Sequence, residues 1–212
     1  EVQQGLQLAA WGGLGMGIQT DGLAYTDAST SAFLTQAYCV LLPLWAAFRS
    51  RQLPSARVVG ATALVVIGVA ILSGIRPDRL SLGRGELETL LSAVFFTGQI
   101  LTLEKPCFAE NRGRPVTLMM CLGIAVLAFP VAWLTAPTSA AMLTAGGSPS
   151  TGLMLATLAI FCTVGAFLLM NTWQRQVPAT EAGLIYTSEP VFAAFYALFL
   201  PAWLATWAGI SY

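Results

Sequence analysis

The stretch GLMLATLAIFCTVGAFLLMNTW, residues 152–173, decides the class of fold to which this chain belongs. It contains no aspartate, glutamate, lysine or arginine. A helix needs about 20 predominantly apolar residues to cross the roughly 30 Å hydrocarbon core of a bilayer. This stretch therefore predicts a transmembrane helix.

Similar stretches recur along the whole chain, separated by short polar segments. Seven spans are expected, at about 6–25, 31–48, 58–75, 87–103, 116–134, 152–173 and 182–200. The composition agrees, because 56% of the residues are hydrophobic and only 9% are charged, against about 25% in a typical soluble domain. The expected fold is all-α, a polytopic bundle of membrane helices.

The composition also excludes several classes of function. Zero net charge without basic runs argues against nucleic acid as a partner. The absence of histidine removes histidine general bases, Ser-His triads and histidine-ligated metals. No Walker A sequence occurs, so the chain carries no nucleotide engine. We expect no catalytic residue, no metal and no cofactor, and hence no enzyme.

Lysine and arginine residues near the span ends indicate the orientation, because cytoplasmic loops carry an excess of both. One set of alternate loops holds seven of them and the other set holds three. The first set is Arg49, Arg51, Arg57, Lys105, Arg112, Arg114 and Arg175, and the second is Arg76, Arg79 and Arg84. We expect the first set in the cytoplasm and a multi-pass protein of the cell's inner (plasma) membrane.

Two hairpins resemble each other at an interval of 151 residues. Ala28–Leu34 follows the first span, and Ala179–Ile185 follows the sixth. The first turn is expected outside and the second inside, so the two hairpins have opposite orientations. Equivalent segments of opposite orientation are typical of the inverted repeats found in secondary transporters.

At these turns the chain resembles the EamA family of the drug/metabolite transporter superfamily. The resemblance covers about residues 5–200 and is carried by loose motifs whose order and spacing are together fairly specific. They are Gly22–Ser29, Thr30–Leu34, Pro54-Ser55, Val59-Gly60, Ile67–Leu72, Trp173–Arg175, Val177–Thr180 and Ser188–Ala193. Cys39 departs from the family pattern, since a proline often occupies its position.

The resemblance implies a ten-helix transporter made of two five-helix repeats in opposite orientation, with both termini in the cytoplasm. The seven spans then correspond to family helices three to nine. Residues 1–75 would be the C-terminal part of the first repeat, with three helices, and 76–86 a linker. Residues 87–212 would be the second repeat without its last helix, with four helices. The start without methionine and the stop at Tyr212 suggest a partial chain.

Two carboxylates lie within the expected spans, where a charge costs about 2.5–3.5 kcal/mol and usually faces a cavity. Glu189 precedes Pro190, whose missing N–H opens the backbone and frees a carbonyl. It is a candidate site for a substrate cation or a proton, or a structural acid at the kink. Asp21 could line the outer half of the same pathway or reach the headgroups. Pro43 is the second candidate kink.

Neutral polar and aromatic residues supply further candidates for substrate contact. Gln99 and Asn171 could hydrogen-bond a substrate or bridge helices, as could Gln19, Gln36 and Gln174. Tyr38 and Tyr186 could contact an aromatic or amphipathic substrate, although such residues more often pack between helices. Glu104 is expected to form a solvated ion pair with Lys105.

These observations favour a secondary transporter, a permease that exports small metabolites or drugs by alternating access. Its partners would be a small-molecule substrate and the lipid bilayer, and a homodimer remains open. One alternative is a seven-helix receptor or sensor that transports nothing, which the inverted repeat disfavours. Another is an intramembrane enzyme, such as a protease or lipid transferase. A protease with two intramembrane aspartates would need a second buried aspartate besides Asp21.

Overall fold

A computed structural model of the chain shows a bundle of helices and describes residues 1–72, 83–136, 138, 149–192 and 195. Within these residues there is no strand, which confirms the all-α class. The helices are α1 (Val2–Gly22), α2 (Ala28–Thr35), α3 (Tyr38–Ser50), α4 (Ala56–Leu72), α5 (Arg84–Leu103), α6 (Gly113–Thr135), α8 (Pro149–Thr157), α9 (Ala166–Trp173) and α10 (Ala179–Tyr186). Most of the expected linker, 76–86, and the end of the seventh expected span lie outside the described residues.

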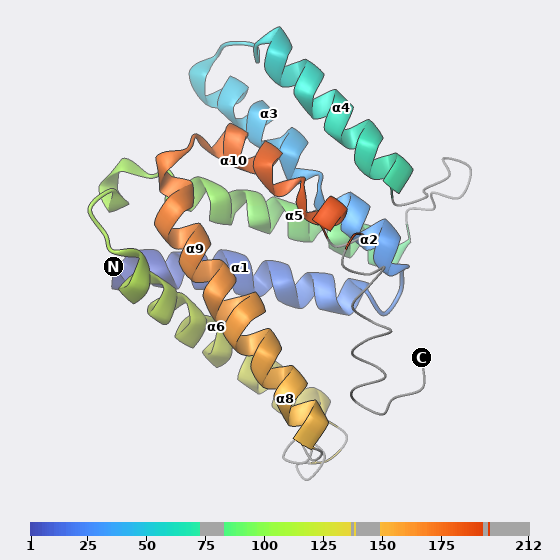
Figure 1. The fold of residues 1–212 in the computed structure, drawn as a ribbon, viewed down its shortest axis with the longest axis vertical. Coiled ribbons are helices and arrows are strands. Elements are labelled where there is room, and N and C mark those ends of the chain that lie inside the picture. Colours follow the sequence, from blue (N-terminus) through green and yellow to red (C-terminus); the bar gives the residue numbers. More distant parts are fainter. Residues whose placement is uncertain (73–82, 137, 139–148, 193–194, 196–212) are drawn as a thin grey trace.

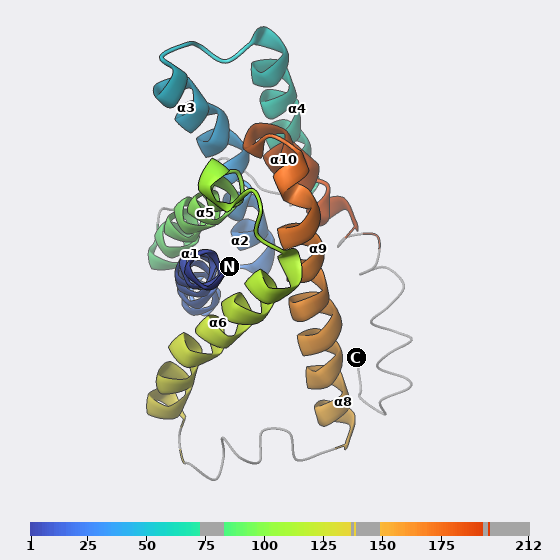
Figure 2. The same ribbon diagram turned by 90° about the vertical axis from the view of Figure 1, so that its left-hand side faces the viewer.

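The centre of the bundle is α1, which packs along α5 on one side and α6 on the other (Figures 1 and 2). Glycines make these close approaches feasible, because small residues let helix backbones come together. A Cβ atom at Gly12 would lie 2.8 Å from the Gln99 amide oxygen, and one at Gly15 would lie 2.9 Å from the Phe96 ring. At Gly5 it would meet Met119 of α6 at 2.5 Å.

The outer helices carry most of the apolar surface. Within the described residues, three helical stretches are long and apolar enough to cross a membrane: Ala28–Ser50, which comprises α2, the turn after it and α3, together with Gly113–Thr135 and Thr151–Gln176. The last of these continues from α8 through a π-helical segment, Leu158–Gly165, into α9 and exposes nearly all of its apolar side chains. By contrast, α1 and α5 are less apolar than these three, and both bury residues against neighbouring helices. The membrane bundle expected from the sequence is confirmed.

The described loops that carry the first set of basic residues lie at the same end of the bundle (Figure 1). The α3–α4 turn, the α5–α6 loop and the α9–α10 turn lie at the end that also holds the N-terminus. They carry Arg51, Lys105, Arg112 and Arg175. The α1–α2 turn and Arg84, at the start of α5, lie at the opposite end. Among the described residues, the fold therefore places these basic residues of the first set at one end and Arg84 of the second set at the other.

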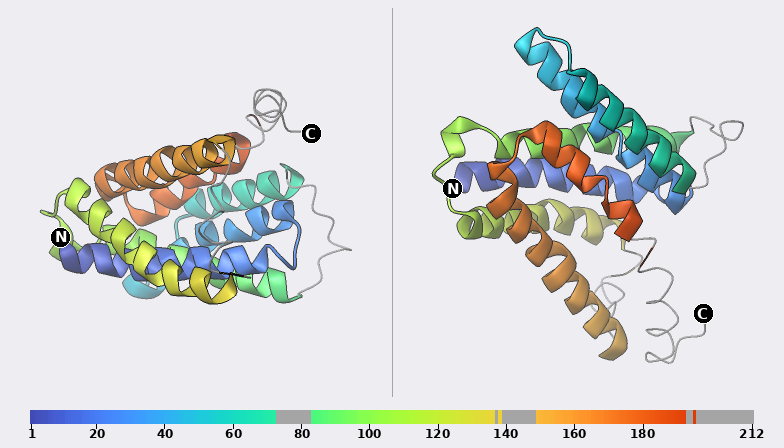
Figure 3. Two further views of the ribbon diagram at one scale, coloured as in Figure 1. Left: turned by 90° about the horizontal axis from the view of Figure 1, so that it is seen from below. Right: turned by 45° about the horizontal axis from the view of Figure 1, so that its top comes forward.

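Two of the expected spans are interrupted helices. The span expected at 31–48 is divided into α2 and α3 by a turn at Gln36–Ala37, and the span expected from Ala182 is divided after α10 by a turn at Thr187–Ser188. Figure 1 shows α1 and the α8–α9 helix running in opposite directions, and α3 and α10 likewise. Figure 3 shows α10 lying beside the α3–α4 pair, and α10 packs on α3, α4 and α5.

Candidate functional site

The contact between α3 and α10 brings the two interrupted helices together. Tyr38 and Leu42 of α3 form a buried cluster with Ile100 of α5, and Tyr186 packs against it. Gly183 makes the approach possible, because a Cβ atom there would collide with the Leu42 side chain. We call this region the α3–α10 contact. It joins the two stretches that the sequence pairs as repeats.

The two helix breaks fall at equivalent positions. The interval of 151 residues that relates Ala28 to Ala179 also relates the turn at Gln36–Ala37 to the turn at Thr187–Ser188. It relates the helical residue after the first break, Tyr38, to the residue after the second, Glu189. The repeat suggested by a short sequence match therefore has the same backbone interruption in both halves.

Each break frees a backbone carbonyl from regular helical bonding. Cys39 N–H donates to the Gln36 oxygen at 2.9 Å, three residues back, so the Thr35 carbonyl loses its usual donor. In the second half Pro190 has no N–H, so the Tyr186 carbonyl lacks the same donor. Proline causes one break but is absent from the other. Pro43, in contrast, lies inside α3, which remains helical through it.

Polar side chains gather around the two breaks. The Tyr186 hydroxyl donates to the Gln174 amide oxygen at 2.9 Å, and Gln174 donates to the Ile100 carbonyl at 3.0 Å. The amide oxygen of Gln36, a residue only 6% exposed, has no hydrogen-bond partner. The exposed Glu189 carboxylate and the Tyr186 hydroxyl both lie near enough to interact electrostatically with the Tyr38 hydroxyl.

A second polar cluster lies where α5, α6 and α9 meet beside α1. Asn171, 1% exposed, donates to the Thr117 hydroxyl at 2.9 Å and also contacts the Met120 sulfur. Gln99 contacts the Met170 sulfur at 3.8 Å. The Asn171 amide oxygen is buried without a hydrogen-bond partner. Gln99 and Asn171 thus bridge helices, and one buried acceptor is left open.

Asp21 lies apart from both clusters, at the end of α1. Arg84 donates to its carboxylate at 2.5 Å, to the Tyr25 hydroxyl at 2.9 Å and to Glu88 at 2.7 Å. The hydrogen bond that Glu88 accepts is the main reason why the pKa of Arg84 is raised. Asp21 is thus part of an exposed ion-pair network that joins the ends of α1 and α5.

The structure brings Tyr38, Tyr186 and Glu189 together, whereas Gln99 and Asn171 lie in the second cluster and Asp21 lies outside both. Sequence reasoning did not single out Gly183, whose role depends on a helix from the other half of the chain. It also paired Glu104 with Lys105, but Lys105 donates to Gln7 at 3.0 Å, and no ion pair of Glu104 occurs within the described residues. The sequence around a glycine or a single charged residue does not show which distant residue it will contact in the fold.

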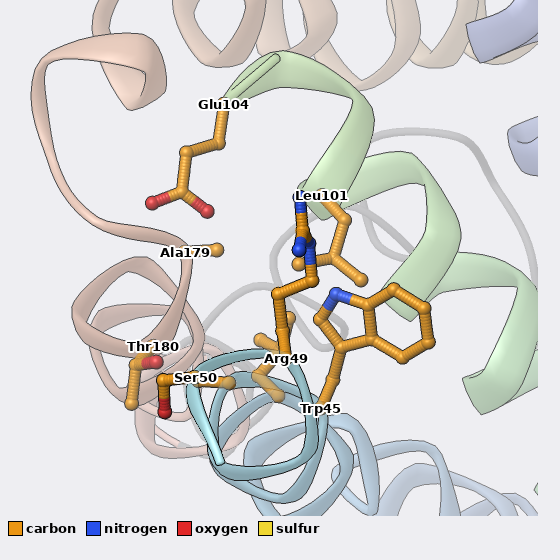
Figure 4. A pocket seen from close by; sticks show the side chains of 9 residues that line it. Trp45, Arg49, Ser50, Leu101, Glu104, Ala179 and Thr180 are labelled. Carbon is orange, nitrogen blue, oxygen red and sulfur yellow. The ribbon is translucent and has the colours of Figure 1, made fainter. Parts of the chain in front are cut away.

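A pocket of about 280 Å³ opens beside the α3–α10 contact, where α3 and α5 end and α10 begins. Figure 4 shows this pocket from close by. It is bounded by the last turns of α3 and α5 and the first turn of α10. Its lining residues are Leu42, Trp45, Ala46, Arg49, Ser50, Leu101, Glu104, Ala179 and Thr180. We call it the mouth pocket. Leu42 belongs both to its wall and to the α3–α10 contact.

Comparisons with known proteins give two matches. The model of the EamA-like transporter family matches residues 85–210. An "Uncharacterized transporter" of Archaeoglobus fulgidus is 27% identical over 208 residues, which cover 97% of this chain and 63% of that relative. The chain thus spans less than two thirds of the length of the relative it matches. No solved structure gives a significant match.

Proposed function

Because the chain belongs to the EamA-like transporter family, we propose that it acts as a secondary transporter that exports small metabolites or drugs by alternating access. Its place would be the inner (plasma) membrane. The observation that carries the proposal is the pair of helix breaks, which occur at equivalent positions in two oppositely directed segments. Interrupted helices near the midplane are how many transporters present backbone carbonyls and half-helix ends to a substrate or ion.

The packing supports a division into a static and a moving part. The helices α1, α5 and α6 are held together along their length by glycine-mediated contacts, such as Gly12 on Gln99 and Gly5 on Met119. The outer pair α3 and α4 meets this core over a smaller surface, chiefly through α3 and α5, and both outer helices also contact α10. Rocking of α3 and α4 against the core and α10 would expose the α3–α10 contact to alternate sides.

Glu189 is the group through which we propose that transport is coupled to protons. It follows the second break, beside Tyr38 of the opposite half. A carboxylate within a span is costly unless it is paired, solvated or neutralised by a proton. Cycling between the protonated and charged forms as the site faces each side would link substrate movement to the proton gradient.

Transport in vesicles tests both parts of the proposal. Purified protein is reconstituted into vesicles, a pH gradient is imposed, and the movement of organic cations, anions and zwitterions is followed with Glu189→Gln and Glu181→Gln variants. Glu181 is the matched control, because it is an exposed glutamate in the first turn of the same helix, α10. We expect Glu189→Gln to lose at least about tenfold in gradient-driven rate, and Glu181→Gln to retain it.

The outcomes separate transport from coupling. Full activity of Glu189→Gln at every pH would contradict the coupling role and leave transport intact. If the unaltered protein moves none of the three classes of compound, with or without a gradient, the transport proposal fails.

A further inference from the structure

The mouth pocket presents two opposite charges that are not paired with each other. Arg49 extends into it from α3, and Glu104 extends into it from the end of α5 (Figure 4). Within the described part of the chain, neither side chain forms an ion pair or side-chain hydrogen bond. Lys105, the residue expected to neutralise Glu104, is held by Gln7 instead. The pocket therefore keeps one cation and one anion available to an occupant.

The rest of the pocket wall is apolar, aromatic or neutral and polar. Trp45 presents its indole beside Arg49 (Figure 4), and Leu42 and Leu101 provide aliphatic surface. Ser50 and Thr180 add two hydroxyls. The pocket is thus suited to a molecule with both charges and an apolar body.

The pocket is also positioned to lead toward the α3–α10 contact. Leu42 forms part of its wall and packs with Tyr38 and Ile100 in the buried cluster. Ala179 belongs to the same wall and cluster, at the start of α10. Any displacement of α3 relative to α5 would change the distance between Arg49 and Glu104. The charged pair therefore spans the two parts that would move during transport.

We propose that the mouth pocket is a binding site for small zwitterions, in which Glu104 receives the cationic group and Arg49 the anionic group. The inference rests on the proposed transport function and specifies its substrate class. A purely anionic molecule would meet the Glu104 carboxylate, and a purely cationic one would meet the Arg49 guanidinium, so each would face one repulsive charge. A zwitterion has a partner for both. The pocket volume of about 280 Å³ limits the occupant to a small molecule.

Binding in detergent tests the charge assignment without requiring transport. Three probes share one branched aliphatic body and differ in the charged groups that it carries: leucine has both groups, 4-methylpentanoate only the carboxylate and 3-methylbutylamine only the ammonium. Calorimetric titration of the purified protein should give the tightest binding for leucine. Each lost charge contact should weaken binding by about tenfold, as expected for roughly 1.4 kcal/mol.

Two variants should alter the preference in opposite directions. In Glu104→Gln we expect 4-methylpentanoate to bind better than it does to the unaltered protein and leucine to bind about tenfold more weakly. In Arg49→Gln we expect 3-methylbutylamine to bind better than it does to the unaltered protein and leucine to bind about tenfold more weakly. Glu181→Gln and Arg51→Gln, which change charges outside the pocket lining, should leave all three affinities unchanged. Thermal unfolding of each variant establishes that it is folded.

Equal binding of the three probes, or a failure of the two variants to exchange the charge preference, would overturn the assignment. So would loss of leucine binding in the Arg51→Gln control alone. Because these titrations need no gradient and no vesicle, a negative result here is distinguishable from a failure of transport. A protein that transports but shows no charge preference would refute the zwitterion site and keep the proposed function.

Discussion

The two interrupted helices of this protein have the same backbone form but different chemistry. In the first, α2 ends at Thr35 and α3 begins at Tyr38; in the second, α10 ends at Tyr186 and the chain becomes helical again at Glu189. Proline is present after one break and absent from the other. The geometry therefore does not depend on proline alone, whereas the carboxylate that could carry a proton occurs in only one half.

A glutamine side chain also forms a hydrogen bond with the residue before each break, but the two glutamines differ in burial and in their number of hydrogen bonds. The residue before the first break, Thr35, accepts a hydrogen bond from Gln19 of α1 at 2.7 Å. The residue before the second, Tyr186, donates to Gln174, which is buried and also bonds the Ile100 carbonyl. The second break is thus held more firmly to the core. Four measurements test or refine this comparison.

The largest effect is expected where the two breaks meet. Gly183→Val would place a branched side chain against Leu42, and overpacking of this kind costs about 1–3 kcal/mol. We expect the free energy of unfolding to fall by about 3 kcal/mol. Thermal unfolding in detergent measures this loss. Gly60→Val in α4, where a Cβ atom meets nothing within 4 Å, is the matched control and should cost much less.

A second substitution checks the cause of that loss. Leu42→Ala alone should cost about 2–5 kcal/mol, because Leu42 is buried, but the double variant should lose less stability than the two single variants together, because the alanine opens the space that the valine needs. Additive losses would show that contact between residues 183 and 42 is not what limits the α3–α10 approach.

The next effect compares the two glutamines. Gln174→Leu leaves the Tyr186 hydroxyl and the Ile100 carbonyl without their hydrogen-bond partner. We expect this change to lower the free energy of unfolding by about 2 kcal/mol. Gln19→Leu removes one partly buried hydrogen bond and should cost about 1 kcal/mol or less. Urea or thermal unfolding of both variants measures the difference. Equal losses of stability in the two variants would contradict the conclusion that the second break is held more firmly to the core than the first.

A proline placed at the equivalent position of the first break should be tolerated. Cys39→Pro removes only the bond from Cys39 N–H to the Gln36 oxygen, so we expect a cost of about 1 kcal/mol. A proline inside an uninterrupted helix costs about 3 kcal/mol or more, and Leu64→Pro in α4 provides that control. If both variants lose the same stability, the first break is not a site already suited to proline.

The smallest effect concerns the turns that precede the breaks. Thr26 donates to Glu86 at 2.6 Å, and this hydrogen bond lowers the pKa of Glu86 below its ordinary value. The stabilisation is therefore present above about pH 4.5 and is lost as pH falls through the lowered pKa. The second turn is held by Arg175, which donates to the backbone carbonyls of Asn111 and Ala109 and forms no ion pair with an acidic residue in the described part of the chain.

Thermal unfolding at several pH values measures this difference. The unaltered protein should be more stable than Thr26→Val at pH 6, and the gap should narrow toward pH 3. Thr26→Ser keeps the hydroxyl and should behave like the unaltered protein. A gap independent of pH would show that the Thr26 contribution does not depend on the Glu86 charge.

Much of the membrane architecture could be predicted because it depends on local composition. Uncharged stretches such as 152–173 must avoid water in any fold, and arginines such as Arg49 and Arg175 must stay at the ends of helices. The inverted hairpins were also visible, because small-polar turns before apolar spans recur at a fixed interval. The helix breaks were only partly visible: Pro190 indicates one, but nothing local at Gln36–Ala37 indicates the other.

The sequence by itself therefore determined that this protein is a bundle of membrane helices with two related hairpins, since hydropathy and charge act residue by residue. Tertiary structure alone decided which polar groups meet. It placed Tyr38 beside Glu189, separated Asp21 from them by pairing it with Arg84, and left Arg49 and Glu104 unpaired across one pocket. Those outcomes depend on contacts between residues far apart in the chain, and no local pattern encodes such distances.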